Sequence, residues 1–313
     1  MTWDVVVLGS ANLDLVYDVA QLPAPGETVL ASAQGRHPGG KGLNQAVAAA
    51  RAGARTGFVA AVGRDEAGDE LVAAMTDAGL GVSLVRRVEQ PSGTALITVQ
   101  SDGENSIVVA PGANGTLEGL TPNERDAVAA ASVLVAQLEV PVAVVAEAAG
   151  VAREAGATVV LNAAPARPLD DSLLSCVDVL VVNEGEARAL AGTHAASTDG
   201  VHVLGKALAE RVETVVVTLG ADGAAWFRRG ADGGRSPGLR AELVDTTGAG
   251  DAFTGALAAG LAGGLDIAEA VERGVVAGAI SVETAGAVPS IPTADQIEAR
   301  RTAVAQRPPE EER

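Results

Sequence analysis

The chain has 313 residues, a mass of 31.1 kDa and 48% hydrophobic residues, enough to bury one large core or a core with a small appended layer. Its net charge of −18 repels phosphate backbones, which disfavours a nucleic-acid-binding protein. The single Cys176 and three histidines without metal-binding spacing exclude a disulfide framework and argue against a zinc site. No basic leader precedes the first apolar run, and the apolar stretches are short, so we expect a soluble, cytoplasmic protein with no membrane partner.

Short apolar runs alternate with Ala-rich segments along most of the chain. The runs predicted as strands are Val5–Gly9, Phe58–Val62, Val133–Gln137, Thr158–Asn162, Val177–Val182 and Val215–Leu219. The segments predicted as helices are Leu43–Ala52, Asp65–Ala78, one starting at Thr121–Glu124, Pro141–Ala155, Glu184–Ala191, Gly200–Arg211 and Ala252–Leu261. Because the strands are almost continuously apolar, both of their faces should be covered. The alternation predicts a mostly parallel sheet with helices on both faces.

Two segments break this alternation and have no helices to cover them. Leu13–Gln34 is strand-like and rich in turns, and Thr94–Gln100 and Ser106–Ala110 flank an Asp-Gly turn within Ser101–Asn105 that is typical of a hairpin. We interpret them as a small antiparallel sheet that projects from the main domain. One face of such a sheet needs a substrate or a partner subunit to cover it.

A glycine-rich segment, Gly35–Gly42, precedes the helix predicted at Leu43. It nearly matches a phosphate-binding P-loop, but Gly42 stands where a hydroxyl is needed, and no buried strand precedes it. We interpret it as a turn whose backbone approaches a polyhydroxylated ligand, with Lys41 and Asn44 as hydrogen-bonding groups. Asn12 and Asp14 alternate just after the first strand, so their side chains would point the same way, toward a pair of sugar hydroxyls or into a local turn.

The segment Asp245–Asp251 (DTTGAGD) opens the helix predicted at Ala252. Gly-Ala-Gly at a helix start exposes backbone N–H groups beside the positive end of the helix dipole, which suits a phosphoryl group in transfer. Asp251 lies in the same turn, so a hydroxyl bound there would meet a carboxylate base and an anion-binding site together. Phe253 occupies the third glycine position of a GxGxxG fingerprint, which disfavours a dinucleotide oxidoreductase.

Polar residues follow other predicted strands, at the edge where ligands of parallel sheets bind. Asn183–Glu186 fits a network of nucleotide phosphate and magnesium, and Thr218–Gly223 offers a tight loop for a flat ligand. Glu139 is a candidate for a sugar hydroxyl. Each motif alone is as consistent with a structural role, but together they favour one shared crevice.

With these motifs the chain resembles the ribokinase-type members of the PfkB sugar-kinase family. Both signature segments are present, Gly39–Ala46 (GGKGLNQA) and Asp245–Gly255 (DTTGAGDAFTG), and the similarity extends from Val7 to Pro292. Further similar segments are Pro25–Thr28, Gly103–Ile107 and Pro111–Asn114. The resemblance implies a three-layer α/β/α core (1–10, 36–92 and 112–306), a β-sheet lid (11–35 and 93–111) and a flexible acidic tail (307–313).

The resemblance also implies roles for individual residues. The sugar would be held by Asn12, Asp14, Gly40, Lys41, Asn44 and Glu139, with Asp251 as general base, Lys41 beside it, and Gly248, Ala249 and Gly250 as anion hole. ATP would contact Asn183, Thr218, Leu219, Gly220, Ala221, Asp222, Gly223 and Gly250, with Val275 replacing a polar or aromatic residue near adenine. Glu186 would belong to the magnesium network, and a monovalent cation such as K⁺ would lie at Asp245, Thr247, Ser281, Thr284, Gly286 and Ser290.

The activity implied is ATP-dependent phosphorylation of D-ribose at its primary hydroxyl, giving D-ribose 5-phosphate, by a homodimer joined through its lids. Two alternatives stay open. One is another kinase of the same family, for deoxyribose, a nucleoside or a ketohexose, because the same base would serve each. The other is a sugar-binding protein without catalysis, against which the intact Asp251, Lys41 and glycine turn argue.

Overall fold

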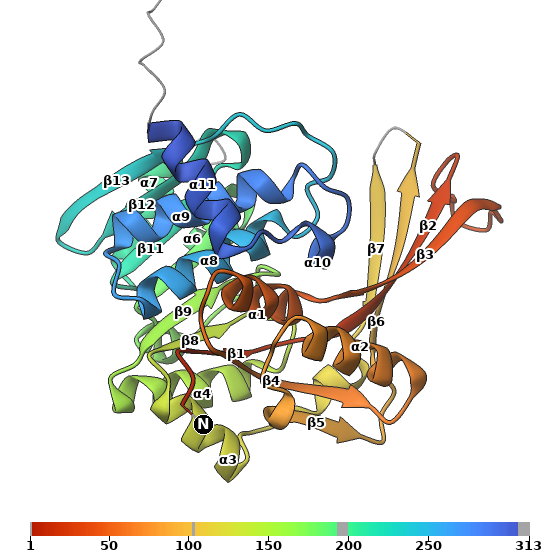
Figure 1. Cartoon of the computed structure of the whole chain (residues 1–313), viewed down its shortest axis with the longest axis horizontal. Helices are drawn as coiled ribbons and strands as arrows, with labels where there is room; N and C mark the ends of the chain where they lie inside the picture. Colours follow the sequence, from red (N-terminus) through yellow and green to blue (C-terminus); the bar gives the residue numbers. More distant parts are fainter. Residues whose placement is uncertain (1, 102–103, 193–199, 306–313) are drawn as a thin grey trace, which may run out of the picture.

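The computed structural model describes residues 2–101, 104–192 and 200–305. A nine-stranded sheet forms the centre of the molecule, and a separate four-stranded sheet projects from it (Figure 1). This arrangement confirms the predicted α/β fold with a mostly parallel sheet and a small lid. The predicted tail at 307–313 and the Asp102-Gly103 turn lie outside the described residues.

The central sheet has the strand order β13-β12-β11-β10-β9-β8-β1-β4-β5. The strands from β11 to β5 pair in parallel, whereas β12 and β13 are antiparallel. Their bounds are β1 Val5–Leu8, β4 Thr56–Gly63, β5 Val85–Val88, β8 Val133–Ala136, β9 Thr158–Asn162, β10 Val179–Asn183, β11 Thr214–Thr218, β12 Gly223–Arg228 and β13 Ala231–Pro237.

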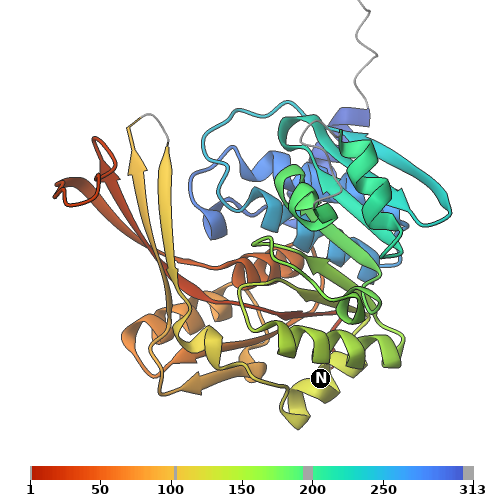
Figure 2. The ribbon, with the colours of Figure 1, turned by 180° about the vertical axis from the view of Figure 1, so that it is seen from behind.

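Helices cover both faces of this sheet, as the front and back views show (Figures 1 and 2). Alternate strand residues face opposite sides, so Val6 and Leu8 join one hydrophobic core while Val5 and Val7 join the other. The first core is closed by α3 (Pro122–Ala130), α4 (Val142–Ala155), α5 (Asp171–Leu174), α6 (Glu184–Ala191) and α7 (Val201–Ala209). The second is closed by α1 (Lys41–Arg51), α2 (Glu66–Asp77), α8 (Ala249–Ala262) and α9 (Ile267–Ser281). Two further helices are α10 (Ala287–Ser290) and α11 (Ala294–Ala305), which packs on α9.

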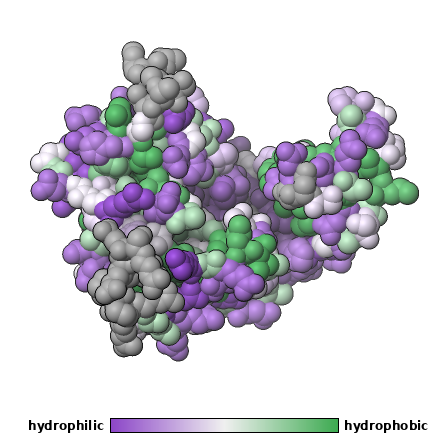
Figure 3. Space-filling model, turned by 90° about the horizontal axis from the view of Figure 1, so that it is seen from above, coloured by the Kyte–Doolittle hydropathy of each residue, from purple (hydrophilic) through white to green (hydrophobic). Residues whose placement is uncertain are grey.

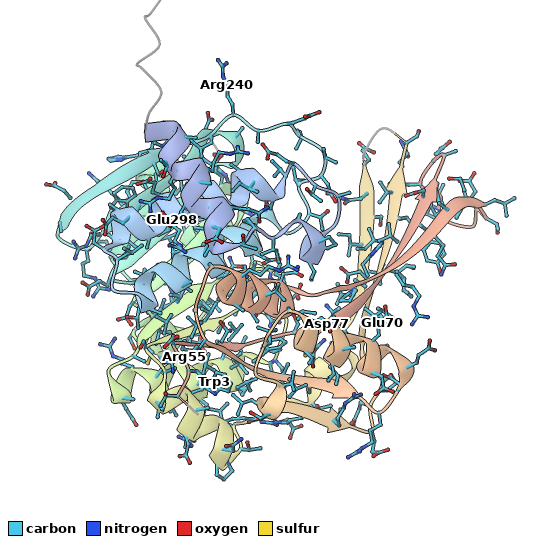
Figure 4. The ribbon with its side chains drawn as sticks, in the orientation of Figure 1. Trp3, Arg55, Glu70, Asp77, Arg240 and Glu298 are labelled. Atoms are coloured by element: carbon cyan, nitrogen blue, oxygen red, sulfur yellow. The ribbon has the colours of Figure 1, made fainter. Side chains whose placement is uncertain are left out.

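The lid has the strand order β3-β2-β6-β7, and β2 and β6 pair in parallel within it. Its strands are β2 (Asn12–Val19), β3 (Ala31–Gly39), β6 (Gly93–Gln100) and β7 (Asn105–Ala110). The sheet is therefore mixed, where the sequence predicted an antiparallel one. Arg36 of β3 pairs with Glu70 of α2 at 3.0 Å, and Glu70 lies beside the base of the lid (Figure 4).

Several elements differ from their predicted bounds. Helix α1 begins two residues before Leu43, because Gly40 adopts φ 90° and turns the chain directly from β3 into the helix. Helix α8 begins at Ala249, which places the glycine turn inside its first turn. The sequence interpretation missed β5, the β12–β13 hairpin, α9 and α11. Cys176 is partly buried and packs against the edge of the first core rather than within it. None of the described helices has the length and hydropathy needed to cross a bilayer.

Candidate active site

A buried carboxylate lies where α8 meets α1. Asp251 is 6% exposed, and its two oxygens accept hydrogen bonds from different amides of α1. Asn44 Nδ2 donates to Oδ2 at 3.0 Å, and Gln45 Nε2 donates to Oδ1 at 2.8 Å. Because the pair of amides orients this carboxylate, it presents a fixed acceptor to the space in front of it.

The close packing of α1 on α8 brings these side chains together. A Cβ added at Gly255, one turn after Asp251, would lie 2.4 Å from Ala48 Cβ and 2.6 Å from the Gln45 carbonyl oxygen. Only a glycine lets the two backbones approach so closely. The second glycine-rich signature therefore positions the first one as well as forming its own turn.

Glu139 anchors the start of α1 from the loop that follows β8. Its Oε2 accepts hydrogen bonds from Ser10 Oγ at 2.6 Å and from the Lys41 backbone N–H at 3.0 Å. A Cβ at Gly42 would lie 2.4 Å from the backbone nitrogen of Ser10, so this turn also requires glycine. Glu139 thus joins the end of β1 to the Gly40–Gly42 turn.

The lid supplies Asn12 and Asp14 from β2. Asn12 Oδ1 accepts a hydrogen bond from Asn114 Nδ2 at 2.8 Å, and Asn114 also bonds both backbone groups of Ala11. Burial, and after it the charges of the nearby Glu139 and Asp251, together raise the pKa of Asp14 to about 7. Asp14 is thus close enough to Glu139 and Asp251 to share one crevice with these two body carboxylates.

Lys41 is the cation among these acidic groups. Asp251 raises the pKa of its ammonium, as do Glu139 and Glu186, while burial opposes them. Lys41 therefore stays protonated and offsets the negative charge of the crevice.

The N-terminus of α8 carries backbone donors beside Asp251. Gly248 is the N-cap with φ 77°, and no side chain caps the helix. The first N–H with a helical partner is that of Ala252, which donates to the Gly248 carbonyl at 2.8 Å, while Ala249 N–H donates to Thr246 O at 3.2 Å. The amides of Gly250 and Asp251 belong to the unpaired first turn, where an anion is favoured.

A cavity of about 520 Å³ opens on the other side of this turn. Its lining includes Thr218, Gly220, Ala221, Gly223 and Gly250 from the predicted ATP set, and Val275, together with Gly238, Leu239, Arg240, Leu243, Phe253 and Val282. Leu219, Asp222 and Asn183 do not line it. The segment 238–243, which follows β13, and α9 form the wall that the sequence interpretation missed, leaving a largely apolar slot for a flat ring.

The remaining predicted nucleotide and magnesium residues form a helix cap. Asn183 Oδ1 accepts from the Glu186 N–H at 2.8 Å, and Glu186 Oε2 accepts from the Asn183 N–H at 2.9 Å. Burial raises the pKa of Glu186, while the bond from Asn183 opposes it. Among the residues described, no three His, Cys, Asp or Glu side chains are placed to hold a metal ion. A magnesium ion held mainly by substrate phosphates, with one protein carboxylate nearby, fits this arrangement.

The predicted monovalent-cation residues lie in the loop before α8 and in the segment from the end of α9 to the end of α10. Asp245 Oδ1 accepts from Thr247 N and Oγ1 at 2.9 and 2.7 Å, and Oδ2 accepts from Gly286 N at 2.8 Å. Burial raises the pKa of Asp245, but these hydrogen bonds outweigh it and hold the pKa below its usual value. The hydroxyls of Ser281 and Ser290 donate to the carbonyls of Gly278 and Ala287, each at 2.8 Å. An ionised carboxylate together with backbone carbonyl oxygens of these segments would provide the oxygen ligands that an alkali cation prefers.

Sequence reasoning missed the amides behind the site: Gln45, Asn162, Gln137 and Asn114. Gln45 stands inside the GGKGLNQA segment and Asn114 inside the similar segment Pro111–Asn114, whereas Gln137 and Asn162 only end predicted strands.

Comparison with known proteins agrees with this geometry. Residues 3–294 match the model of the pfkB family carbohydrate kinases. The chain is 39% identical to the ribokinase of Haemophilus influenzae over 92% of its own length and 94% of that protein. It is 34% identical to a deoxyribokinase of Salmonella typhi over 94% and 97% of the two chains. The structure of Arabidopsis thaliana ribokinase complexed with ribose and ATP superposes with a TM-score of 0.89 at 33% identity, covering 96% of this chain and 98% of that chain.

A buried carboxylate beside a helix N-terminus, with a polar crevice on one side and a ring-sized cavity on the other, is the arrangement of a phosphotransferase. The chain belongs to the pfkB family of carbohydrate kinases.

Proposed function

We propose that this protein transfers the γ-phosphoryl group of ATP to the primary hydroxyl of D-ribose. The observation that carries the proposal is the position of Asp251. It is oriented by two amides, lies close to the charged groups of Asp14 and Lys41, and follows directly the Gly250 that lines the cavity. A hydroxyl in the crevice and a phosphate chain from the cavity would meet at this residue. Similarity to ribokinases along most of the chain supports the same activity.

The sugar-binding set is Asn12, Asp14, Gly40, Lys41, Asn44 and Glu139. Asn44 Oδ1 is buried without a hydrogen-bond partner, so a sugar hydroxyl would supply the missing donor. Glu139 uses only Oε2 in its protein contacts, and its Oε1 is left for a second hydroxyl. Asp14 supplies the acceptor for the vicinal hydroxyls.

In the reaction, Asp251 accepts the proton of the attacking hydroxyl as its oxygen bonds to the γ-phosphorus, while the bond between that phosphorus and the bridging oxygen breaks and ADP leaves. The Gly248–Gly250 turn and the positive end of α8 stabilise charge on the transferring phosphoryl group. Lys41 adds a positive charge between the reactants. Magnesium bound with ATP supplies charge neutralisation on the phosphates, and Glu186 would contact its water shell.

Two further features belong to the proposal. A potassium ion at Asp245, Thr247, Ser281, Thr284, Gly286 and Ser290 would order the loop that leads into the anion hole. Leu96, Ile107, Val108 and Val109 of the lid are exposed, and hydrophobic residues gather on the lid, which a hollow separates from the body (Figure 3). A second lid would cover these side chains, giving a homodimer. A cytoplasmic location, where ATP is available, also belongs to the proposal.

The test is an ADP-release assay with D-ribose, 2-deoxyribose, a ketohexose and adenosine. Ribose should exceed 2-deoxyribose in kcat/KM by about tenfold or more, because a missing hydroxyl leaves a buried acceptor unpaired at about 1–3 kcal/mol. Asp14→Ala should cost ribose more than 2-deoxyribose. A preference for 2-deoxyribose, the activity named for the Salmonella relative, or for adenosine would overturn the choice of sugar.

The general base is tested separately with Asp251→Asn. This change keeps the shape of the side chain, so sugar and ATP binding should persist while kcat falls about 10²- to 10⁴-fold. Near-normal turnover by the purified variant would remove Asp251 from the mechanism, and absence of turnover by the unaltered protein with every substrate would favour a sugar-binding protein.

A further inference from the structure

A chain of buried amides extends behind Asp251 into the central sheet. Gln45 Nε2 donates to Asp251 Oδ1 at 2.8 Å and to Asn162 Oδ1 at 2.9 Å, and Gln45 Oε1 accepts from Gln137 Nε2 at 2.7 Å. Gln45 and Gln137 are fully buried, and Asn162 is 8% exposed. No part of the proposed reaction uses these three side chains.

The direction of the chain is set by the backbone of the sheet. Asn162 ends β9, and its Nδ2 donates to the Val181 carbonyl of β10 at 3.1 Å. A carbonyl can only accept, so Asn162 must present its oxygen to Gln45. Gln45 must then direct its NH₂ group toward Asn162 and Asp251, while its oxygen receives the amide of Gln137, the residue after β8. The amide that faces the carboxylate is therefore held as a donor by Asn162 of β9 and by Gln137 after β8, and Asn162 is itself oriented by β10.

The two amides that donate to Asp251, those of Asn44 and Gln45, differ in their other contacts. Asn44 retains an unpaired oxygen for the sugar, so it links the carboxylate to the substrate. Gln45 lies one residue further along α1, where the close approach at Gly255 holds the helix against α8, and it links the carboxylate to the sheet. A base that is fixed on both oxygens keeps one orientation toward the incoming hydroxyl, and small displacements from that geometry lower the rate strongly.

We infer that Gln45, oriented by Asn162 and Gln137, is the positioning residue of the catalytic base. The inference rests on the proposed role of Asp251. Gln45 acts through Asp251 and does not itself touch the substrates.

The test compares Gln45→Met with the unaltered enzyme, because methionine preserves length and approximate volume but removes both polar groups. We expect kcat to fall about 10- to 100-fold, with KM for ribose and for ATP within about threefold. Val47→Ala is the matched control on the same helix. It removes buried methyl groups from the second core, so it should lower the Tm while kcat is retained.

A double-mutant cycle that combines Gln45→Met with Asp251→Asn distinguishes a loss of carboxylate orientation from a general loss of stability. If Gln45 acts by orienting the carboxylate, Gln45→Met should have little further effect on kcat once that carboxylate is gone. An equal fold-loss in both backgrounds would overturn the inference, and so would a folded Gln45→Met enzyme with kcat within threefold of normal.

The two proposals fail in different ways. Normal turnover by Asp251→Asn would refute the general base, whereas collapse of that variant together with normal turnover by Gln45→Met would refute only the positioning role. If Gln45→Met does not fold, Gln137→Met serves instead, because it removes one support of Gln45 without touching Asp251. It should lower kcat about 3- to 10-fold at unchanged KM, and an unchanged kcat would overturn the inference.

Discussion

Asp14 should make the sugar-free protein less stable as the pH rises. Its pKa is raised from 3.8 to about 7, first by burial and then by Glu139 and Asp251. Between these two values the folded protein holds a proton that the unfolded chain has released. Folding stability therefore falls as the pH rises through this window, and the full cost persists above pH 7.

The magnitude follows from the difference between the two pKa values. At about 1.4 kcal/mol per pH unit the ceiling is about 4 kcal/mol, and residual solvent contact of Asp14 lowers it through screening. Asp14→Asn replaces the carboxyl by a neutral group of the same shape. We expect this variant to be stabilised relative to the unaltered protein, by about 1–3 kcal/mol more at pH 8 than at pH 5.

The assay is urea denaturation of both proteins at pH 5 and pH 8 without sugar. Asp18→Asn is the control, because Asp18 is exposed on the same lid strand and its substitution changes the net charge equally. The same Asp14→Asn variant should raise KM for ribose, since the lost carboxylate is the proposed acceptor of sugar hydroxyls. A stability difference between Asp14→Asn and the unaltered protein that does not change with pH would refute the reasoning.

Three further outcomes are expected. Potassium should raise kcat several-fold over sodium or choline at equal ionic strength, because an ion beside Asp245 would order the anion-hole turn, and equal rates in all three salts would remove this site. Val108→Asp, which places a charge on a lid residue that is 64% exposed, should shift a dimer to monomer in sedimentation velocity, and a monomeric unaltered protein would refute the lid interface. Gly255→Val should lower both unfolding free energy, by about 1–3 kcal/mol or more, and kcat, because its Cβ would clash with Ala48; full activity at normal Tm would contradict the packing argument.

Local patterns in the sequence determined the class of fold and the chemistry of the site. Apolar strands such as Val215–Leu219 alternate with helical segments, and that period is a property of neighbouring residues, readable without knowing their partners. The two glycine signatures could also be interpreted from the sequence alone. The turns at Gly40 and Gly248 have a positive φ, which glycine adopts readily, so the residue type itself indicates the turn. Asp251 could be predicted as the base for the same reason, because the neighbouring residues alone place it in the first turn of a helix.

Only the tertiary structure decided which side chains hold that base. Gln45 meets Asn162 across 117 residues and Asp251 across 206 residues, and an amide in an apolar stretch carries no mark of the group it will face. The antiparallel hairpin of β12 and β13, which leads into the cavity-lining segment 238–243, was missed because strands at the edge of a sheet are defined by their neighbours rather than by their own residues. Asp14 acquires its raised pKa in the same way, because burial and the charges of Glu139 and Asp251 exist only once lid and body share a crevice.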